Sequence, residues 1–600
     1  MPRPKGGPGM GPVEKAKDFK GTIKKLLASL GKLKAAIIVV VVFAIASTVF
    51  AIIGPKILGT ATNEIFAGFT SKLGGGSGIN FGKVHSILTT LLILYVISSV
   101  LSYVQGYIMS IVTQKYTYRL REELSNKIHK LPFGYFDHKQ NGEVLSVFTN
   151  DIDTLQMSLN QVITQLITSI TTIIGVLVMM LTINIPLTIV SIVLIPISVI
   201  FMALVMKKSQ KHFKDNQKYL AAVNGNVEEM YSGHNVVKAF NAERKMLHEF
   251  DKNNKKLYTA GWKSQFLGGL IHPIMIFISN LNYVLVSILG GYLAMKGKIK
   301  VGDITSFIAY TKNLNQPITS IGQVASQIQS MIAAAERIFT FLDAAEEEYK
   351  GTKLFDDVEG NVSFNNIKFG YNSDRIIIKN FSAKVKAGQK IAIVGPTGAG
   401  KTTIVKLLMN FYHLNDGSIT IDGVDINDYD IHELRKGIGM VLQDTWLYSG
   451  TIMENLRYGN LAATDEEVIE AAKIANVHHF IKTLPDGYNM VIDEEVNNIS
   501  QGQKQLLTIA RTILSKSKIL ILDEATSNVD TRTEELIQSA MDKLMIGKTS
   551  FIIAHRLSTI KNADLILVMD DGDIVEIGNH QELLNKNGFY ANLYNSQFQK

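Results

Sequence analysis

The chain has 600 residues, of which 46% are hydrophobic, and its formal net charge is +8 at pH 7. This length exceeds what one hydrophobic core normally serves, so at least two domains are expected. The sequence contains no cysteine, which excludes disulfides, a thiol nucleophile and cysteine-ligated zinc. Basic residues cluster before and between the apolar runs. This distribution is typical of the cytoplasmic loops of a membrane protein, and no nucleic-acid partner is expected.

The N-terminal residues 1–16 are rich in Pro and Gly and are predicted to be disordered. They are not a signal peptide, because the first apolar run starts only near Ala35. Between these segments, lysines occupy one face of a helical pattern and apolar residues the other. This pattern predicts an amphipathic helix on the cytoplasmic leaflet. A solvated basic linker is the alternative interpretation.

Six apolar runs follow, and each is long enough to cross a hydrocarbon core of about 30 Å as a helix. They cover residues 35–57, 84–112, 157–182, 186–206, 266–295 and 304–334. Six spans place both chain ends on one side, and the lysine-rich connections after runs two and four indicate the cytoplasmic side. The short outer loop 296–300 carries three lysines and opposes this assignment. We predict a multi-pass protein of the cell (plasma or inner) membrane with a cytoplasmic N-terminus and C-terminal domain.

Charge is scarce in the predicted spans. Runs two to five contain no Asp, Glu, Lys or Arg, which leaves no obvious proton relay. The sixth run is more polar, with several amides beside the single cation Lys312. A hydrated cavity would explain these amides, and so would amide contacts between helices. A largely uncharged cavity suits small amphipathic substrates that enter from the membrane lipids.

From about residue 362 the composition changes to short apolar runs that alternate with helical segments. This alternation predicts an α/β domain on a mainly parallel sheet. The expected strands include 390–395, 418–423, 518–524, 549–555 and 565–578. The predicted fold class is therefore multi-domain: a six-helix α transmembrane domain over 17–345, with an amphipathic elbow helix, and an α/β domain over 355–600.

The α/β domain contains a phosphate-binding loop directly after an apolar strand. The loop GPTGAGKTT consists of Gly395, Pro396, Thr397, Gly398, Ala399, Gly400, Lys401, Thr402 and Thr403. In such a P-loop, backbone N–H groups and the N-terminus of the next helix bind phosphate oxygens. We expect Lys401 to reach the β- and γ-phosphates of ATP and the Thr402 hydroxyl to bind Mg²⁺.

A second group of residues fits hydrolysis of that nucleotide. Asp523 ends the predicted strand KILILD, where its carboxylate can hold the metal or a metal-bound water. Glu524 follows and can orient or deprotonate the attacking water. His555 ends another predicted strand and is expected beside the γ-phosphate. Gln443, in the stretch VLQD, can reach both the metal and the water.

The stretch ISQGQ stands directly before the apolar helical run LLTIARTIL. Ser500 is a good N-cap and Gly502 permits close backbone approach, with Gln501 and Gln503 beside them. The positive end of this helix is a second anion-binding terminus in a domain that already has one. We therefore expect it to bind the γ-phosphate held by another copy of the domain.

Together these motifs resemble those of ATP-binding cassette (ABC) exporter half-transporters, a family that has a P-loop ATPase domain of ABC type. The string 499–503 is similar to the family signature, which acts in trans in a head-to-tail nucleotide sandwich. The resemblance implies that Tyr371 stacks on adenine and that Asp530 belongs to the D-loop 527–530. It also implies that Gln443 is the Q-loop glutamine and His555 the switch histidine.

The resemblance covers about residues 17–600 and implies an ATP hydrolase that is coupled to transport. It implies that segments 136–153 and 228–243 are coupling segments, the second of which docks on the opposite subunit. The expected activity is ATP-driven efflux of amphipathic or lipophilic compounds. A lipid flippase or lipid exporter is the main alternative, and an importer of siderophores with an exporter-type fold is another.

One position departs from the family pattern. Gln501 stands where the family signature usually has Gly, whereas the residues expected to form this chain's own ATP pocket match the family. We favour a heterodimer with a second ABC half-transporter, in which the altered signature faces a partner's degenerate pocket. A homodimer that tolerates Gln501 is the alternative.

Overall fold

The structure is a computed structural model that describes residues 16–137, 139–372, 375–442, 445–492, 499–523, 530–553 and 557–598. Its contacts divide the chain into two compact units. The helical unit consists of Met1–His129 and Gln140–Ala345. The sheet unit consists of Lys130–Lys139 and Glu346–Lys600, so a short segment from the middle of the helical half belongs to the sheet unit.

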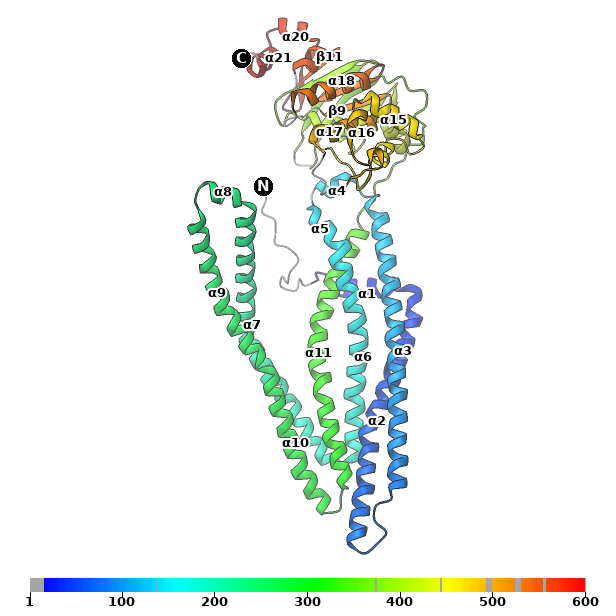
Figure 1. The fold of residues 1–600 in the computed structure, drawn as a ribbon, viewed down its shortest axis with the longest axis vertical. Coiled ribbons are helices and arrows are strands. Elements are labelled where there is room, and N and C mark those ends of the chain that lie inside the picture. Colours follow the sequence, from blue (N-terminus) through cyan, green and yellow to red (C-terminus); the bar gives the residue numbers. More distant parts are fainter. Residues whose placement is uncertain are drawn as a thin grey trace. The chain divides into compact units, whose positions relative to one another are not determined.

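Long helices make up the helical unit (Figure 1). They are α1 (Phe19–Ser29), α2 (Lys34–Leu73), α3 (Phe81–Ile128), α6 (Ile152–Ile183), α7 (Ile185–Ser232), α9 (Glu243–Gly269), α10 (Ile271–Met295) and α11 (Val301–Leu342). Shorter pieces connect them: η1 (Gly31–Leu33), α5 (Asn141–Ser146), the π-helix η2 (Val147–Asp151) and α8 (His234–Ala239). The expected amphipathic helix is α1, which buries Thr22 and Leu26.

Five helical segments in the described part of the chain are long and apolar enough to cross a membrane. They are Lys34–Leu73, Phe81–Ile128, Asn141–Ile183, Ile185–Ser232 and Glu243–Met295, and they contain the first five predicted spans. The sixth predicted span lies in α11, which is one continuous helix but is not among these five. Its asparagines, glutamines and Lys312 make it more polar than the others.

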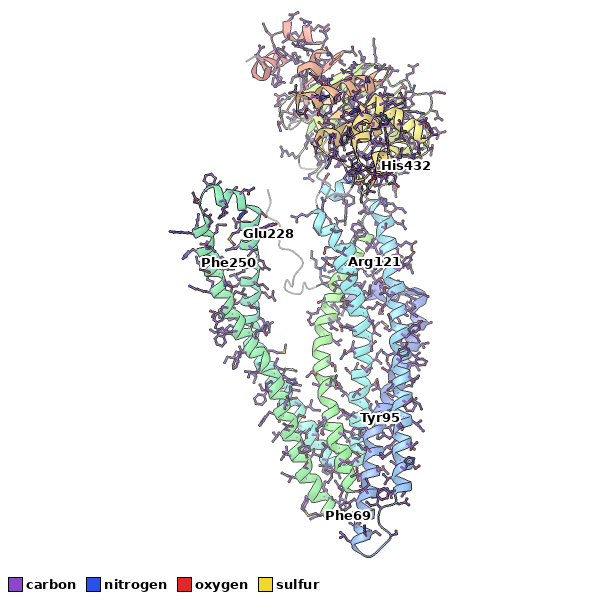
Figure 2. The ribbon with its side chains drawn as sticks, viewed as in Figure 1. Phe69, Tyr95, Arg121, Glu228, Phe250 and His432 are labelled. Carbon is purple, nitrogen blue, oxygen red and sulfur yellow. The ribbon has the colours of Figure 1, made fainter. Side chains whose placement is uncertain are left out.

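The helices continue well past the apolar runs. α7 extends to Ser232, and α8 joins it to α9, which returns beside it; Figure 2 labels Glu228 and Phe250 on the two neighbouring helices. The α8 end of this pair carries exposed aromatic side chains, with Tyr231 85% and Phe240 79% exposed. The connection between spans four and five is therefore helical over most of its length.

Two glycines let helices α2 and α11 pack backbone against backbone. A Cβ on Gly59 would lie 2.4 Å from the Gly302 carbonyl oxygen, and a Cβ on Gly302 would lie 1.9 Å from the Gly59 carbonyl oxygen. Near this contact, the Ser306 hydroxyl donates to the Pro55 carbonyl at 2.8 Å. Tyr310 donates to the Ile52 carbonyl at 2.9 Å. Small residues with hydroxyl hydrogen bonds are the usual means of joining helices in a bilayer, where apolar contact alone gives little preference.

The sheet unit is built on a ten-stranded sheet in the order β5-β4-β1-β2-β12-β11-β3-β10-β9-β6. Its strands are β1 (Val362–Phe369), β2 (Ile378–Val385), β3 (Lys390–Val394), β4 (Asp416–Ile421), β5 (Val424–Asp425), β6 (Ile438–Val441), β9 (Ile519–Asp523), β10 (Thr549–Ile553), β11 (Leu565–Asp570) and β12 (Asp573–Gly578). β11, β3, β10, β9 and β6 run parallel, whereas β1, β2, β4 and β5 pair antiparallel. A separate two-stranded sheet pairs β7 (Gly450–Thr451) with β8 (Val491–Ile492).

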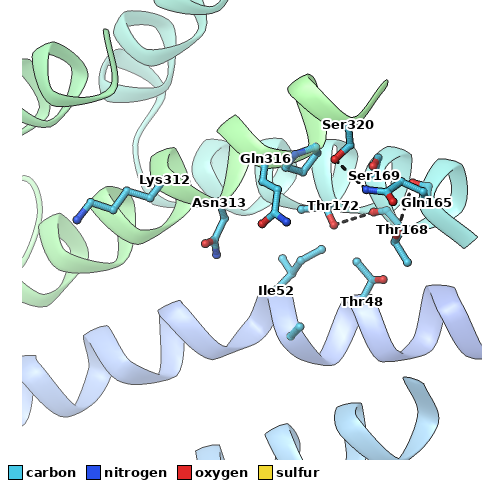
Figure 3. A pocket seen from close by; sticks show the side chains of 12 residues that line it. Thr48, Ile52, Gln165, Thr168, Ser169, Thr172, Lys312, Asn313, Gln316 and Ser320 are labelled. Carbon is cyan, nitrogen blue, oxygen red and sulfur yellow. Dashed lines mark hydrogen bonds between the residues drawn. The ribbon is translucent and has the colours of Figure 1, made fainter. Parts of the chain in front are cut away.

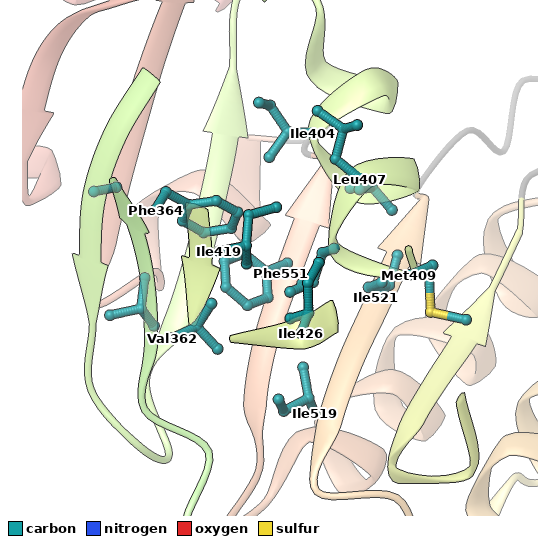
Figure 4. Close-up of a cluster of buried hydrophobic side chains, with 14 of the residues drawn as sticks. Val362, Phe364, Ile404, Leu407, Met409, Ile419, Ile426, Ile519, Ile521 and Phe551 are labelled. Atoms are coloured by element: carbon teal, nitrogen blue, oxygen red, sulfur yellow. The ribbon is translucent and has the colours of Figure 1, made fainter. Parts of the chain in front are cut away.

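Helices cover both faces of the parallel strands. They are α12 (Lys401–Leu408), α13 (Ile431–Gly437), α14 (Ile452–Arg457), α15 (Asp465–Ile474), α16 (His478–Thr483), α17 (Gln501–Leu514), α18 (Thr531–Met545), α19 (Leu557–Lys561), α20 (His580–Asn585) and α21 (Phe589–Phe598). Because side chains alternate along a strand, Ile519 and Ile521 of β9 join one buried cluster with Phe551, and Leu520 and Leu522 join another. Figure 4 shows the first cluster, where Ile404 and Leu407 of α12 meet the sheet.

Each of the five segments predicted from the sequence contains strand in the structure, but 565–578 forms two antiparallel strands, β11 and β12. Residues 524, 554 and 555 of the predicted segments lie outside the described residues. The expected parallel sheet is right for the central strands, where the near-continuous apolar runs are buried on both faces. The segment 418–423 instead lies mainly in β4, which is antiparallel to β1. Hydrophobic runs do not encode strand direction, so the sequence could not separate the two parts.

A buried carboxylate connects the π-helix to α11 in the helical unit. The Asp151 side chain, which is 4% exposed, accepts hydrogen bonds from Arg337 Nε at 2.9 Å and Arg337 Nη2 at 2.5 Å. The Arg337 side chain is 41% exposed. Removal of Arg337 and removal of Asp151 should therefore cost different amounts of stability. An unpaired Asp151 would remain desolvated, whereas an unpaired Arg337 can be hydrated.

We expect Arg337→Ala to destabilise the protein more than Asp151→Ala. An unsatisfied buried acceptor costs about 1–3 kcal/mol, and more when it is charged, whereas a hydrated arginine costs little. The thermal midpoint in detergent should fall in the order parent, Asp151→Ala, Arg337→Ala. The double variant should regain part of the stability lost in Arg337→Ala, because the desolvated carboxylate is removed together with its partner. Equal midpoints for the two single variants would contradict this account of the pair.

Candidate functional site

Parallel strands bring the predicted chemical groups to one edge of the sheet. β3, β10, β9 and β6 are consecutive neighbours and run in the same direction. The P-loop follows Val394 at the end of β3, and Asp523 is the last residue of β9. β10 ends at Ile553 and β6 at Val441. Ligands of parallel α/β sheets bind beyond the carboxyl ends of such strands.

Glycines at three positions shape the P-loop. Gly398 and Gly400 have φ angles of 89° and 98°, which residues with a Cβ rarely adopt. A Cβ on Gly395 would lie 2.2 Å from the Met569 carbonyl oxygen, and one on Gly400 would lie 2.6 Å from Cδ1 of Ile378. The loop leads directly into α12, whose N-cap is Gly400. The result is a set of backbone N–H groups at a helix N-terminus, which suits a phosphate.

Lys401 lies inside this loop. Its ammonium donates to the carbonyl oxygens of Gly395 at 2.8 Å and Pro396 at 3.0 Å, and the residue is 8% exposed. Burial lowers the pKa of Lys401, and the Asp523 carboxylate acts in the opposite direction. A buried cation bonded only to neutral carbonyls gains electrostatically when anionic phosphate oxygens approach.

A cavity of about 480 Å³ opens above the loop. It is lined by Arg375, Ile376, Ile377, Thr397, Gly398, Gly400, Lys401, Thr402, Thr403, Asp523, Ile553 and Asp571. The structure thus brings Asp523 to the P-loop, as expected. The sequence did not identify the lining by Arg375 and Asp571. Arg375 follows Tyr371, the predicted adenine-stacking residue, by only four positions. This closeness in sequence could have indicated that Arg375 lies at the nucleotide site.

Tyr371 is near the loop but does not line this cavity. Its hydroxyl lies 3.4 Å from the Thr403 hydroxyl, and its ring packs edge-on against Phe369 and Tyr412, with centroids 5.1 Å apart in both cases. These contacts fix the ring beside α12. Its predicted role on adenine stays a prediction.

The residues Gln443, Glu524 and His555 lie outside the described residues. The described strands that precede them, β6, β9 and β10, are neighbours in the sheet. Of the predicted metal ligands, Thr402 and Asp523 line the same cavity. No cluster of three or more His, Cys, Asp or Glu was found among the described residues. Two protein oxygens fit Mg²⁺, which usually keeps several waters and completes its shell with substrate phosphates.

The predicted signature forms the start of α17. Ser500 caps the helix: its hydroxyl accepts from the Gln503 N–H at 3.3 Å, and the Gln503 side chain accepts from the Ser500 N–H at 2.9 Å. Gly502 is buried. The exposed Gln501 donates from Nε2 to the Thr445 hydroxyl at 3.2 Å. The altered residue is thus bonded within its own chain to the segment after Gln443.

Asp530 is also a helix cap. Its carboxylate accepts from the Thr533 N–H at 3.1 Å at the start of α18, and its hydrogen bonds with Thr533 lower its pKa. The remaining residues of the predicted D-loop, 527–529, lie outside the described residues.

Segment Lys130–Lys139 forms a docking contact inside the sheet unit. Helix α4 (Phe133–Asp137) places the ring of Phe133 on Phe411 with 4.3 Å between centroids. Tyr412 donates to Asp137 at 2.6 Å, and the pKa of Tyr412 is raised by burial and by this carboxylate. The contact begins before the predicted coupling segment 136–153, whose later part forms α5 and η2 of the helical unit.

A second cavity, of about 290 Å³, lies in the helical unit among α2, α6 and α11 (Figure 3). It is lined by Thr48, Ala51, Ile52, Gln165, Thr168, Ser169, Thr172, Lys312, Asn313, Gln316, Pro317 and Ser320. Gln165 bridges two of these helices by donating to the Ser320 hydroxyl at 2.9 Å. Of the amides of the sixth run, Gln327 contacts α6 by donating to Gln161 at 2.9 Å, whereas Asn313 and Gln316 line the cavity.

The fold and the P-loop define an ATP-binding domain fused to a set of membrane-type helices. Comparison with known proteins identifies the family. Residues 37–318 match the ABC transporter transmembrane region and residues 378–527 match the ABC transporter family. The chain belongs to the ABC transporter family, as an exporter-type half-transporter, and is an ATP-hydrolysing translocase.

Similar proteins cover almost the whole chain. An uncharacterized ABC transporter ATP-binding protein of Bacillus subtilis (strain 168) is 41% identical over 98% of this chain and 96% of its own. A fatty acid ABC transporter ATP-binding/permease protein of Mycobacterium bovis is 42% identical over 96% of this chain and 97% of its own. A putative multidrug export ATP-binding/permease protein of Bacillus subtilis is 34% identical over 87% and 91%.

Gly400→Ala should weaken ATP binding by about tenfold or more, the effect of about 1.4 kcal/mol. The new Cβ would lie 2.6 Å from Cδ1 of the fully buried Ile378, and relief of this contact would shift the loop N–H groups. Binding of a fluorescent ATP analogue measures the change. Gly388→Ala is the matched control: Gly388 has a φ of 77° in the turn before β3, but its Cβ would meet nothing within 4 Å. If both variants bind ATP like the parent, the steric argument is wrong.

Proposed function

We propose that the chain is one half of an ATP-driven exporter of amphipathic or lipophilic compounds that works by alternating access. The observation that carries this proposal is the polar cavity among α2, α6 and α11, inside helices whose other exposed side chains are largely apolar. A wall of hydroxyls and amides can hold the polar part of an amphipathic molecule. The apolar part can then lie against the spans.

In the proposed hydrolytic site, Lys401 holds the β- and γ-phosphates, and Thr402 and Asp523 hold Mg²⁺. The ion would offset the charge on the phosphate oxygens. Gln443 contacts the metal and the water, Glu524 orients or deprotonates that water, and His555 donates to the γ-phosphate. The adjacency of β3, β10, β9 and β6 supports this assignment, because these strands lead to all of the loops involved.

The proposed nucleotide contacts include further residues. Tyr371 would stack on adenine, while the backbone of the P-loop (Gly395, Pro396, Thr397, Gly398, Ala399, Gly400 and Thr403) surrounds the phosphates. The partner's γ-phosphate would be met by Ser500, Gln501, Gly502, Gln503 and Asp530.

We further propose that the protein lies in the cell (plasma or inner) membrane with its N-terminus and ATPase domain in the cytoplasm. For the domain limits we propose those expected from the sequence, 17–345 and 355–600. The exposed Tyr231 and Phe240 beside α8 support a contact with a second subunit, since large exposed aromatic side chains are characteristic of interfaces.

Export of lipid is the second candidate function. It is favoured by the relative described as a fatty acid transporter, which matches this chain over nearly its full length. The relative described as a multidrug exporter favours the first candidate. Both substrates are amphipathic, so the same cavity can be proposed for either. A siderophore importer of exporter-type fold would transport in the opposite direction.

Reconstituted vesicles test the proposed transport. With ATP on the side of the sheet unit, the protein should move an amphipathic dye across the bilayer. Glu524→Gln should abolish this movement while ATP still binds, because loss of a water-positioning base usually lowers the rate by about 10²–10⁴-fold. A fluorescent lipid serves as the second cargo. Dye movement that does not depend on ATP would overturn the export assignment. Uptake of a ferric siderophore instead of export of the dye would also overturn it.

We propose a heterodimer as the assembly. The bond from Gln501 to Thr445 supports a changed signature surface, whereas the P-loop residues of this chain keep the family pattern. In a heterodimer the changed signature can face a partner's weaker pocket, while the partner's signature completes this chain's pocket.

Co-expression with the product of a neighbouring gene tests this assembly. The two chains should purify together at equal ratio, and their ATPase rate should exceed that of this chain alone, because only the mixed dimer completes the working pocket. Native mass determination gives the composition. The heterodimer proposal would be wrong if this chain formed a stable homodimer with full ATPase activity and co-expression of the neighbouring gene product did not raise the ATPase rate.

A further inference from the structure

The side chains that line the cavity in the helical unit differ in whether their hydrogen-bond donors are free to bind a ligand. Several hydroxyls that line it are already used inside their own helices. Thr48 donates to the Ala44 carbonyl at 2.7 Å, Thr168 to Thr164 at 2.9 Å and Thr172 to Thr168 at 2.7 Å. The donors of these three side chains therefore cannot serve a ligand without breaking a bond in the helix.

One turn of α11 adds three further polar side chains to the lining of the cavity. Lys312, Asn313 and Gln316 line the cavity and are exposed, and Figure 3 shows them in order along the helix. Within the described part of the chain, none of the three side chains forms a hydrogen bond or ion pair with another described residue. The Lys312 ammonium lies 5.9 Å from the ring centroid of Tyr283, a contact with an aromatic face that leaves its N–H groups free.

Acidic groups are remote from Lys312. No described residue that lines the cavity is acidic. On α11 itself, Asp303 is nine positions away, roughly 13 Å along a helix, and its carboxylate accepts from the Lys300 N–H. On the neighbouring helices, α10 has no Asp or Glu, α6 has only Asp153, and α2 has only Glu64, which pairs with Lys83. Among the described residues, none therefore gives this cation a counter-charge at the cavity.

We infer that this turn of α11 is a binding site for the anionic head group of a single-chain amphiphile. The carboxylate or phosphate of such a molecule would accept from Lys312 and from the amide N–H groups of Asn313 and Gln316. A charge-assisted bond in a site of low dielectric is stronger than a neutral one. A cavity of about 290 Å³ lies at the lower end of ligand-site volumes, so it suits a head group, with the chain lying against the apolar spans.

This inference rests on the proposed export function and names the chemistry of its substrate. It distinguishes anionic amphiphiles from neutral and cationic ones, all of which the proposed function includes. Neutral and cationic amphiphiles would gain nothing from Lys312, and cationic ones would be repelled by it. Anionic amphiphiles would be selected by their head group, and chain length would matter less than charge.

A matched series of head groups on one chain tests the site. Decanoate, decyl phosphate, decanol and decyltrimethylammonium are compared as stimulators of ATPase activity in the complete transporter dimer, reconstituted in neutral lipid. In the parent protein decanoate or decyl phosphate should stimulate at lower concentration than decanol. Lys312→Gln should raise the half-stimulating concentration of the anions by about tenfold or more, the effect of one charge-assisted hydrogen bond. It should leave that of decanol unchanged.

Two further variants control for structure and for net charge. Lys312→Arg keeps the charge and should retain the preference for anions. Lys298→Gln removes the same charge from the exposed outer loop, away from the cavity, and should retain it as well. A preference for the carboxylate over the phosphate, or the reverse, identifies which head group the site accepts.

Three results would overturn the site. They are a parent protein that does not respond to either anion, an unchanged preference in Lys312→Gln, and an equal loss in Lys298→Gln. Each of these can occur while ATP-dependent dye transport persists, which would leave the proposed function intact. Loss of dye transport in the parent protein would instead remove the proposed function.

Discussion

Four parallel strands, β3, β10, β9 and β6, are the constraint on which the nucleotide site depends. Their side chains are buried on both faces, so neither register nor direction can change without exposing apolar surface. This packing brings the P-loop and Asp523, more than a hundred residues apart in the chain, to one cavity. Glycines then let the loop come close enough to Met569 and Ile378 to keep its N–H groups directed at a phosphate.

A different constraint governs the helical unit. Inside a bilayer the backbone must satisfy its own hydrogen bonds, which leaves long helices as the available elements. Apolar contact then gives little specificity, and polar or close-packed contacts decide which helices meet. The glycine contact between α2 and α11, the bond from Gln165 to Ser320, and the Asp151–Arg337 pair serve this purpose. The cavity beside Lys312 lies between the helices that these contacts join.

Segment 130–139 lies within the sequence of the helical half but packs with the sheet unit. Helix α4 packs its Phe133 on Phe411, and its Asp137 accepts from Tyr412, so this piece of the helical half is part of the sheet unit. The bond from Gln501 to Thr445 similarly ties the signature helix to the segment that follows β6.

The sequence alone determined the elements and the chemistry. Six apolar runs of bilayer length predicted spans, and five of them lie in helical segments that are long and apolar enough to cross a membrane. The P-loop predicted its own strand, loop and helix. These signals are local. Tertiary structure decided what depends on distant partners: the antiparallel part of the sheet, the place of Arg375 and Asp571 in the nucleotide cavity, and the donors left free around Lys312. Strand direction and the availability of a hydrogen-bond donor depend on which residues become neighbours in the fold. The local hydrophobic pattern of the sequence does not specify those neighbours.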